Sequence, residues 1–562
     1  MRQLIPFLFQ YSKGIRSFRS IAVFAVISGA LGGLASAGLL ALINASLNDP
    51  LKAPISLVIA FFCLCLLVPL IRFVSEILVI RISTEVTFDL RVKLFWRILS
   101  APLIRVEQNG PARLMATLTD DVNAISNTLT SVPTFCINFA VVIGCLIYLA
   151  WLSWIVFAIV IALAVLGTIS YQLPLNKGLH YQGLARENWD DVFKHFRALT
   201  EGIKELKLHR QRRRVYAETF MSSMSNSQRI SKVWMIIFSA ASHWSEILVF
   251  IFIGFVVFIL PHLKTIDPKI LTSACITVLY MFGPVAILIG TFPVLGRANI
   301  AILKIQKLGL SLGDEANDDT SALLPVPVWT SLELSGVTHA YHTENETTNF
   351  ILGPLDLSFT PGQTTFVTGG NGSGKTTLIK LITGLYIPES GEIRLDGNAI
   401  TEGKWDDYRQ FFSVVFSDFY LLEKLFGIDS KKIGASANDY LVQLQLDQKV
   451  KVNNGAFSTT ELSQGQRKRL ALLTAFLEDR PIYIFDEWAA DQDPVFKEIF
   501  YHRLLPDLKS RGKTVIVITH DDRYYDVADR VIKLEYGKVN FDKLNIRRAE
   551  HSVADVTTYS QP

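Results

Sequence analysis

The longest uncharged stretch of the chain does most to limit its fold. No residue between Val122 and Asn176 is Asp, Glu, Lys or Arg. A helix that crosses a bilayer needs about 20 apolar residues. The stretch therefore fits two spans joined by a tight turn near Trp151-Leu152-Ser153-Trp154. Hydrophobic residues make up 50% of the chain and charged residues only 19%, a balance that indicates a membrane protein.

Further uncharged runs extend this pattern to six predicted spans. They cover about residues 21–47, 55–80, 130–151, 153–173, 234–260 and 270–296. Between them, the charged segments 83–121 and 177–232 are each long enough for two helices that extend roughly 35 Å beyond the membrane. The turns of these segments could touch a cytoplasmic domain. We expect residues 1–310 to form an α-helical transmembrane domain.

The placement of basic residues predicts the orientation of the spans. Lysine and arginine gather in the N-terminal lead and in the two long charged segments, which include a cluster at 210–214. The short connections on the opposite side hold only Lys52, Lys264 and Lys269. Basic residues favour the cytoplasmic side, so both termini are predicted to be cytoplasmic and the chain to be a multi-pass protein of the bacterial inner membrane.

Composition also limits the partners. The net charge of +4 is too small to indicate a nucleic acid partner. All five cysteines lie in apolar stretches, which fits packing in buried or lipid-facing helices better than disulfides or a metal site. These are Cys63, Cys65, Cys136, Cys145 and Cys275.

Four ionisable residues lie within or beside the predicted spans. Arg72 and Glu76 are four residues apart and can pair on one helical face, and Glu246 lies near His243. Charges inside a membrane are costly and usually face a cavity or each other. Two interpretations stay open. The residues line a polar chamber for a peptide-like substrate, or they form internal ion pairs near the cytoplasmic ends of long helices.

The chain changes character after the last span. Residues 311–330 are acidic and punctuated by Pro325 and Pro327, which is typical of a linker. From residue 331 to 545 the pattern becomes short strands, turns and helices, as in a soluble α/β domain. Residues 546–562 are expected to be a C-terminal tail.

A glycine-rich loop gives this second domain its chemistry. It reads Gly369-Gly370-Asn371-Gly372-Ser373-Gly374-Lys375-Thr376-Thr377, after a β-like run and before an apolar helical pattern. Glycines let backbone N–H groups cradle phosphate oxygens, and the helix N-terminus adds positive charge. Lys375 would reach the β- and γ-phosphates and Thr376 would ligate Mg²⁺. ATP and Mg²⁺ are therefore the predicted ligands.

Two carboxylates follow a second buried run. The apolar segment 481–485 ends in Asp486 and Glu487. A parallel strand that ends in a carboxylate places it beside the phosphate loop, at the same edge of the sheet. Asp486 would hold Mg²⁺, and Glu487 would be the general base that polarises the attacking water.

Leu462-Ser463-Gln464-Gly465-Gln466 resembles the signature motif of ABC ATPases, with Gln464 where glycine is commonest. The resemblance implies a six-span transmembrane domain of the exporter type followed by an α/β P-loop nucleotide-binding domain of ABC type. It also implies that Ser463 and Gly465 contact the γ-phosphate of an ATP held by a second subunit. With one nucleotide domain per chain, a homodimer is the simplest arrangement.

The same resemblance assigns further positions. His520, after the apolar run 515–519, matches the histidine near the γ-phosphate. Tyr341 matches the aromatic that stacks on adenine, with Phe350 as a competitor. Asp493 matches a loop that communicates across the dimer. One departure is Ser417, which stands where the family usually has glutamine. Asp418 could compensate for it.

Two segments resemble bacterial exporters of cyclic peptides and siderophores, which include pyoverdine-type and microcin-type exporters. They are Val415-Phe416-Ser417-Asp418 and Asp486-Glu487-Trp488-Ala489-Ala490-Asp491-Gln492-Asp493-Pro494. This implies ATP-driven export of a cyclic peptide, a peptide siderophore or its precursor, with membrane lipid as the surroundings. A lipid or multidrug flippase and a siderophore importer of the exporter fold are the alternatives.

Overall fold

A computed structural model of the chain describes residues 18–48, 54–263, 267–307, 328–340, 350–428 and 430–545. The chain divides into two compact units. The first contains residues 1–100 and 109–316, and the second contains residues 101–108 and 317–562. Most of the predicted linker, the C-terminal tail, Tyr341, Lys52 and Lys264 lie outside the described residues.

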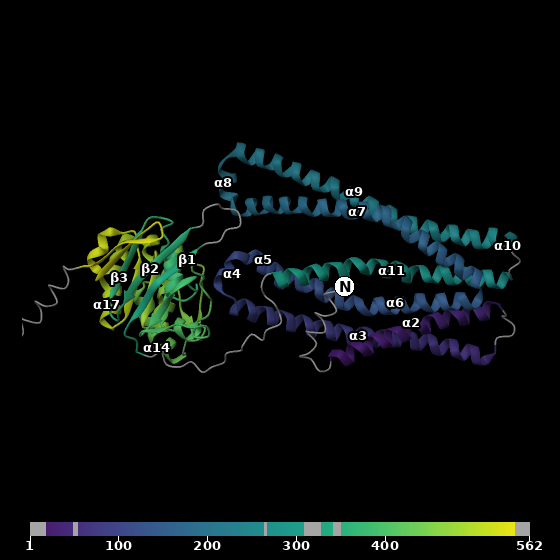
Figure 1. Ribbon diagram of the computed structural model, residues 1–562, viewed down its shortest axis with the longest axis horizontal. Helices are drawn as coiled ribbons and strands as arrows, with labels where there is room; N and C mark the ends of the chain where they lie inside the picture. The colour runs from purple at the N-terminus through teal and green to yellow at the C-terminus, as the bar shows by residue number, and fades with distance from the viewer. Residues whose placement is uncertain are drawn as a thin grey trace, which may run out of the picture. The chain divides into compact units, whose positions relative to one another are not determined.

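The first unit is built from long helices (Figure 1). Its elements are α2 (Phe18–Asn48), α3 (Ile55–Ser100), α5 (Pro111–Ala116), the π-helical turn η3 (Thr117–Asp121), α6 (Val122–Leu152), α7 (Trp154–Glu201), α8 (Ile203–Leu208), α9 (Arg210–Gly254), the π-helical turn η4 (Phe255–Ile259), α10 (Leu260–Leu263) and α11 (Pro268–Lys307). Helices α3, α7 and α9 have 46, 48 and 45 residues. At 1.5 Å per residue each is about 70 Å long, more than twice the thickness of a bilayer core. They are therefore long enough to continue well beyond a membrane, as the charged segments predicted.

Among the described residues, five helical stretches are long and apolar enough to cross a membrane. They are Val26–Leu47, Ile55–Ser100, Arg113–Leu152, Arg210–His262 and Pro268–Gln306. The remaining predicted span, 153–173, falls on α7, where the apolar part is the shorter stretch Trp154–Ser170. Ser153 separates α6 from α7 and accepts a hydrogen bond from the Val156 N–H, so the tight turn predicted here is confirmed.

Small residues let α2 and α6 approach each other closely. A Cβ atom on Gly33 would lie 2.5 Å from the Ile137 carbonyl oxygen, and a Cβ on Gly144 would lie 2.6 Å from the Ala37 Cβ. Close backbone approach at small residues is a common way to associate helices in a membrane, where apolar burial gives no net gain. Any larger residue at Gly33 would push the two helices apart.

The second unit is an α/β domain. Its elements are α4 (Leu103–Asn109, of which Asn109 falls in the first unit), β1 (Leu332–Ala340), β2 (Ile351–Phe359), β3 (Thr364–Gly369), α12 (Lys375–Ile382), β4 (Ser390–Leu395), β5 (Asn398–Ala399), α13 (Trp405–Arg409), β6 (Phe412–Val415), α14 (Ser430–Gln443), β7 (Val452–Asn453), β8 (Ala456–Phe457), α15 (Gln464–Glu478), β9 (Ile482–Asp486), η5 (Trp488–Asp491), α16 (Pro494–Ile499), η6 (Phe500–Leu504), α17 (Leu505–Ser510), β10 (Thr514–Ile518), η7 (Asp522–Val527), β11 (Arg530–Glu535) and β12 (Lys538–Leu544).

Sheet topology brings the motifs together. The six-stranded sheet has the order β12-β11-β3-β10-β9-β6, and every pair is parallel except β11 with β12. Strands β3, β9 and β10 are buried along their whole length. Because the carboxyl ends of parallel strands share one edge, the segments that follow these three strands converge there. A second, antiparallel sheet has the order β2-β1-β4-β5.

Residues 101–108 leave the helical unit and join the α/β unit. Leu103 and Ile104 of α4 pack against its apolar core. Glu107 accepts hydrogen bonds from the Lys380 ammonium, at 2.7 Å, and from the Tyr386 hydroxyl. The prediction that this turn touches the domain that follows the spans is therefore confirmed.

Candidate functional site

The phosphate loop connects β3 to α12, and two of its glycines are sterically required. Gly369 has φ 150° and a Cβ there would lie 2.3 Å from the Leu534 carbonyl oxygen. Gly374 has the left-handed φ of 99°, and a Cβ there would lie 2.8 Å from Leu352 Cδ1. Only glycine avoids both the clash and the backbone strain. The loop thus directs the chain into the N-terminus of α12, where free N–H groups favour an anion.

Lys375 lies inside this loop with only 6% of its side chain exposed. Its ammonium donates to the carbonyl oxygens of Gly369 and Gly370, each at 3.0 Å, and lies 4.0 Å from Glu487 Oε1. Burial lowers the pKa of Lys375, while the carboxylates of Glu487 and Asp486 oppose that shift. The ammonium is therefore held inside the loop, where it would meet a bound phosphate.

Asp486 gathers two hydroxyl groups at the end of β9. Its Oδ2 accepts from Thr376 Oγ1 at 3.2 Å and from Ser417 Oγ at 3.3 Å. Its Oδ1 is buried and has no hydrogen-bond partner. Burial raises the pKa of Asp486, and the Thr376 and Ser417 hydroxyls oppose this. The unpaired Oδ1, on a carboxylate whose Oδ2 accepts from two hydroxyls, suits a hard divalent cation, so these residues fit Mg²⁺.

The described residues contain no group of three or more His, Cys, Asp and Glu side chains that could hold a metal. The residues that would hold Mg²⁺ are one carboxylate and two hydroxyls, a set that would leave coordination positions for phosphate oxygens and water. Ser417 stands in place of the expected glutamine and still reaches Asp486. Asp418 follows it on the surface.

Glu487 and His520 come together from neighbouring strands. Ile518 of β10 pairs with Asp486 of β9, and the Glu487 N–H donates to the Ile518 carbonyl. This register brings His520 Nε2 to 3.0 Å from Glu487 Oε1. Both side chains are partly exposed, at 44% and 37%, so water can reach the carboxylate. The pairing agrees with a base that is oriented by a histidine.

The signature motif begins helix α15. Ser463 is the N-cap: its hydroxyl accepts from the Gln466 N–H, and the Gln466 side chain accepts from the Ser463 N–H, both at 3.4 Å. A Cβ on Gly465 would lie 3.0 Å from the Asp491 carbonyl oxygen. Gln464, at the position where the family has glycine, donates to Asp491 Oδ2 at 3.2 Å. The motif therefore packs against the loop that follows Glu487.

Asp493 stabilises the fold locally, in addition to its predicted role in communication across the dimer. Its carboxylate accepts from the Phe496 N–H at 2.9 Å and caps α16, and it pairs with Arg469 of α15. The Phe496 N–H and the Arg469 guanidinium hold the pKa of Asp493 below its usual range. Its role in communication between subunits stays a prediction.

Two aromatic residues, Tyr341 and Phe350, are the candidates for the adenine contact. Tyr341 lies outside the described residues. A Cβ on Gly374 would lie 3.1 Å from Phe350 Cζ, so the competitor Phe350 lies beside the phosphate loop. The two candidates therefore both stay open.

Three of the four ionisable residues predicted within or beside the spans have a hydrogen-bond partner among the described residues. His243 Nδ1 lies 3.0 Å from Glu246 Oε2 on α9. Arg72 donates to Ser36 Oγ of α2 at 2.7 Å rather than to Glu76, whose side chain is exposed. Two turns further along α2, Asn44 donates to Thr277 of α11 at 3.4 Å. Polar bonds of this kind join helices in an apolar medium. The assignment of the four ionisable residues to a substrate chamber stays a prediction.

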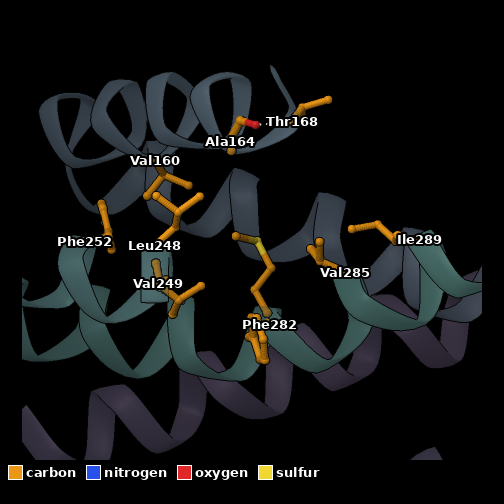
Figure 2. A pocket seen from close by; sticks show the side chains of 12 residues that line it. Val160, Ala164, Thr168, Leu248, Val249, Phe252, Phe282, Val285 and Ile289 are labelled. Carbon is orange, nitrogen blue, oxygen red and sulfur yellow. Dashed lines mark hydrogen bonds between the residues drawn. The ribbon is translucent and has the colours of Figure 1, made fainter. Parts of the chain in front are cut away.

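Sequence reasoning missed an apolar pocket of about 270 Å³ between α7, α9 and α11. Figure 2 shows side chains from three helices gathered around this space. It is lined by Val160, Ala164, Gly167, Thr168, Leu248, Val249, Phe252, Val278, Met281, Phe282, Val285 and Ile289. The lining recurs every three or four residues on each helix, as one face of a helix does. The sequence therefore shows that each helix has one apolar face. It does not show that these three faces meet around one pocket.

Comparisons with known proteins agree with this architecture. Residues 20–285 match the ABC transporter transmembrane region, and residues 352–490 match the ABC transporter family. The chain is 38% identical to the ATP-binding protein SyrD of Pseudomonas syringae pv. syringae over 536 residues, which cover 93% of this chain and 94% of SyrD. It is 27% identical to the ATP-dependent lipid A-core flippase of Alkalilimnicola ehrlichii, over 83% of this chain and 80% of the flippase.

Among solved structures, a bacterial Atm1-family ABC exporter with ATP bound has the same fold. The TM-score is 0.69 with 15% sequence identity, and the match covers 97% of this chain and 99% of the other. The predicted fold class, a helical transmembrane domain followed by a nucleotide-binding domain of ABC type, is confirmed.

Proposed function

The chain belongs to the ABC transporter family, and from this premise we propose that it forms a homodimeric, ATP-driven exporter of a peptide-like molecule across the bacterial inner membrane. The family establishes the coarser part, an ATPase of ABC exporter type. The observation that carries the proposal is that one chain contains both the membrane helices and a nucleotide site. In that site Asp486 contacts Thr376 of the phosphate loop, and Glu487 contacts His520.

The proposed mechanism assigns each residue a task at the nucleotide. The phosphate loop and Lys375 bind the β- and γ-phosphates. Asp486, Thr376 and Ser417 would hold Mg²⁺, which when bound neutralises phosphate charge. Glu487 accepts a proton from the attacking water, and His520 keeps the carboxylate oriented.

The homodimer is supported by the different contacts of the phosphate loop and the signature motif. The hydrogen bonds of Gln464 and Gly465 run to Asp491 and Gln492, while Ser463 presents the N-terminus of a 15-residue helix. Such a terminus attracts phosphate. We assign its target to the ATP of a second, identical subunit, as the family resemblance implies. ATP then favours the closed dimer because it contacts both subunits only in that state.

The apolar pocket supports a cargo with at least one apolar group. Eleven of its twelve lining residues carry no hydroxyl, amide or charge, and Thr168 is the exception. Its volume is below the roughly 300–1,000 Å³ of sites that enclose a drug-sized ligand. It therefore suits one large side chain or a short acyl chain. On α9, Glu246 precedes Val249 by three residues and so lies on the same face as the pocket, where it would meet the polar part of the cargo.

ATPase stimulation of the protein in nanodiscs tests this proposal. The panel contains cyclic peptides and siderophore precursors, in pairs that differ in one apolar or polar side chain. The apolar member of each pair should stimulate more strongly. Ala164→Trp, which fills the pocket, should abolish the difference, whereas Val165→Trp on the exposed side of α7 should preserve it. No response to any peptide would refute the peptide cargo.

A flippase is the second candidate because a lipid A-core flippase matches most of the chain. Stimulation by lipids in the absence of peptide response would favour it. A siderophore importer of the exporter fold would show the opposite direction of transport in inverted vesicles. Inner-membrane location with both termini cytoplasmic is proposed from the placement of the basic residues.

A further inference from the structure

One buried lysine touches the catalytic loop without belonging to any predicted site. Lys468 lies on the first turns of α15 and only 3% of its side chain is exposed. Its ammonium lies 2.7 Å from Asp491 Oδ2 and donates to the Glu487 carbonyl oxygen at 3.1 Å. A buried charge is retained only where it is paired and hydrogen-bonded. These two acceptors meet that need.

The backbone of Glu487 gives this contact a purpose. Glu487 has φ 49° and ψ 32°, in the left-handed region that non-glycine residues seldom occupy. Such a conformation persists only where the surroundings determine it. The Glu487 carbonyl accepts from both the Ala490 N–H and the Lys468 ammonium. Lys468 therefore helps fix the backbone from which the general base projects toward His520.

The same residues connect α15 to this loop at further points. Trp488 Nε1 donates to the Lys468 carbonyl oxygen at 2.9 Å, and its ring stacks on Phe500 at 4.4 Å. Asp491 also accepts from Gln464. Thus Gln464, which stands where the family commonly has glycine, contacts the segment from Trp488 to Asp491 that follows the general base.

We propose that Lys468 is a positioning residue for ATP hydrolysis. Its ammonium joins the start of the signature helix to the loop that carries Glu487, so that the two move as one body and the base keeps its productive backbone conformation. The inference rests on the ATPase activity alone. It needs no assumption about the cargo.

The test is the kinetics of Lys468→Met in nanodiscs, since methionine keeps the apolar stem and removes the donor. We expect kcat to fall between about tenfold and 100-fold, as for a small misplacement of a catalytic group, with KM for ATP changed by less than about twofold because Lys468 does not touch the phosphate loop.

Lys513→Met is a matched control. Lys513 pairs with Asp479 at 2.8 Å and donates to the carbonyl of that residue, which is also left-handed with φ 52°. This contact lies at the C-terminal end of α15, about 16 Å from Lys468 along the helix axis. The control should lose thermal stability like Lys468→Met but keep its kcat. An equal effect of both variants on kcat, or unchanged kcat in Lys468→Met, would overturn the proposal.

A second variant covers the case in which Lys468→Met does not fold. Asp491→Asn removes the negative charge of one partner of the ammonium, on a side chain that is 40% exposed. We expect its kcat to fall by about threefold to tenfold. In the double variant Lys468→Met, Asp491→Asn the loss of kcat should be smaller than the product of the two single losses, because the effects of residues in contact are not additive. Unchanged kcat in Asp491→Asn would contradict the proposal, and so would fully multiplicative losses.

Discussion

The contact of Glu107 with the nucleotide domain predicts how ATP hydrolysis is coupled to transport. Glu107 lies on α4, in the chain between α3 and α6. Its partners Lys380 and Tyr386 follow the phosphate loop, on α12 and just after it. A rearrangement of α12 that accompanies nucleotide binding would therefore move α4 through these two bonds. Glu107→Ala removes both bonds and leaves the phosphate loop itself intact.

The size of the effect follows from burial. Lys380 is 16% exposed and Glu107 38% exposed, while Tyr386 is 2% exposed. A hydrogen bond to a charged group contributes about 1.5–3 kcal/mol when buried, and exposed pairs contribute about 0–1 kcal/mol. With the discount for the exposed carboxylate, we expect a loss of about 1–2 kcal/mol, which lowers the ratio of docked to undocked α4 by a factor of about 5–30.

The assay compares basal ATPase activity with cargo transport per ATP hydrolysed in proteoliposomes. We expect Glu107→Ala to keep basal kcat within about twofold, because the residues at the phosphates are unchanged. Transport per ATP should fall, by at most the same factor of about 5–30. Glu107→Gln keeps an acceptor for Tyr386 and should lie between wild type and alanine. The rate of hydrogen exchange in residues 101–108 should increase from wild type to Glu107→Gln and further to Glu107→Ala.

Glu85→Ala is the control. Glu85 pairs with Arg81 on α3, at 3.4 Å with both side chains largely exposed, so its loss should alter neither measurement. If Glu107→Ala kept full transport per ATP, or if basal ATPase fell in proportion, then α4 would not be the coupling contact and this reasoning would be wrong.

Three further predictions concern the nucleotide site and the membrane helices. Burial raises the pKa of Asp486, and Mg²⁺ binds its ionised form, so Mg²⁺-dependent ATP binding should weaken as pH falls, beginning above the pH expected for an ordinary aspartate of pKa about 3.9. Ser417→Ala removes a hydroxyl that opposes the shift and should move this loss to higher pH in Mg²⁺ titrations, while the exposed Asp418→Asn should not; identical profiles for wild type and Ser417→Ala would contradict the contact. Glu487→Gln should bind ATP and accumulate the closed dimer in cross-linking, with hydrolysis reduced at least about 100-fold, and turnover like wild type would remove Glu487 from its assigned role. Gly33→Ala should lower the melting temperature because its Cβ would lie 2.5 Å from the Ile137 carbonyl, whereas Gly38→Ala, with no atom within 4 Å, should be neutral or stabilising; equal melting temperatures would refute the close packing of α2 and α6.

Several features could be predicted because they depend on neighbouring residues in the chain. The phosphate loop, the carboxylates after an apolar run and the histidine after another are each local motifs. Their convergence follows from the parallel order of three buried strands, a rule that needs no coordinates. The uncharged run from Val122 to Asn176 likewise determined a membrane-embedded fold, because a bilayer admits only structures that satisfy their own backbone.

Other features depend on which distant segments meet. Nothing in the sequence pairs Glu107 with Lys380, Lys468 with Asp491, or the faces of α7, α9 and α11 around one pocket. Ser417 replaces the glutamine that the family usually has, and only the tertiary structure brings its hydroxyl to Asp486. In each case the contact is made by side chains whose distance is set by how whole elements pack.

The sequence by itself therefore determined the kind of protein: apolar runs that a membrane must enclose, and a phosphate loop with the carboxylates that ATP hydrolysis needs. The tertiary structure decided how those parts are connected, from Glu107 on α4 to the ammonium of Lys468. The physical reason is range. Hydrophobic periodicity and motif chemistry act within one helix or one strand and its loop, whereas a buried ion pair acts only where packing has brought two distant segments within about 3 Å.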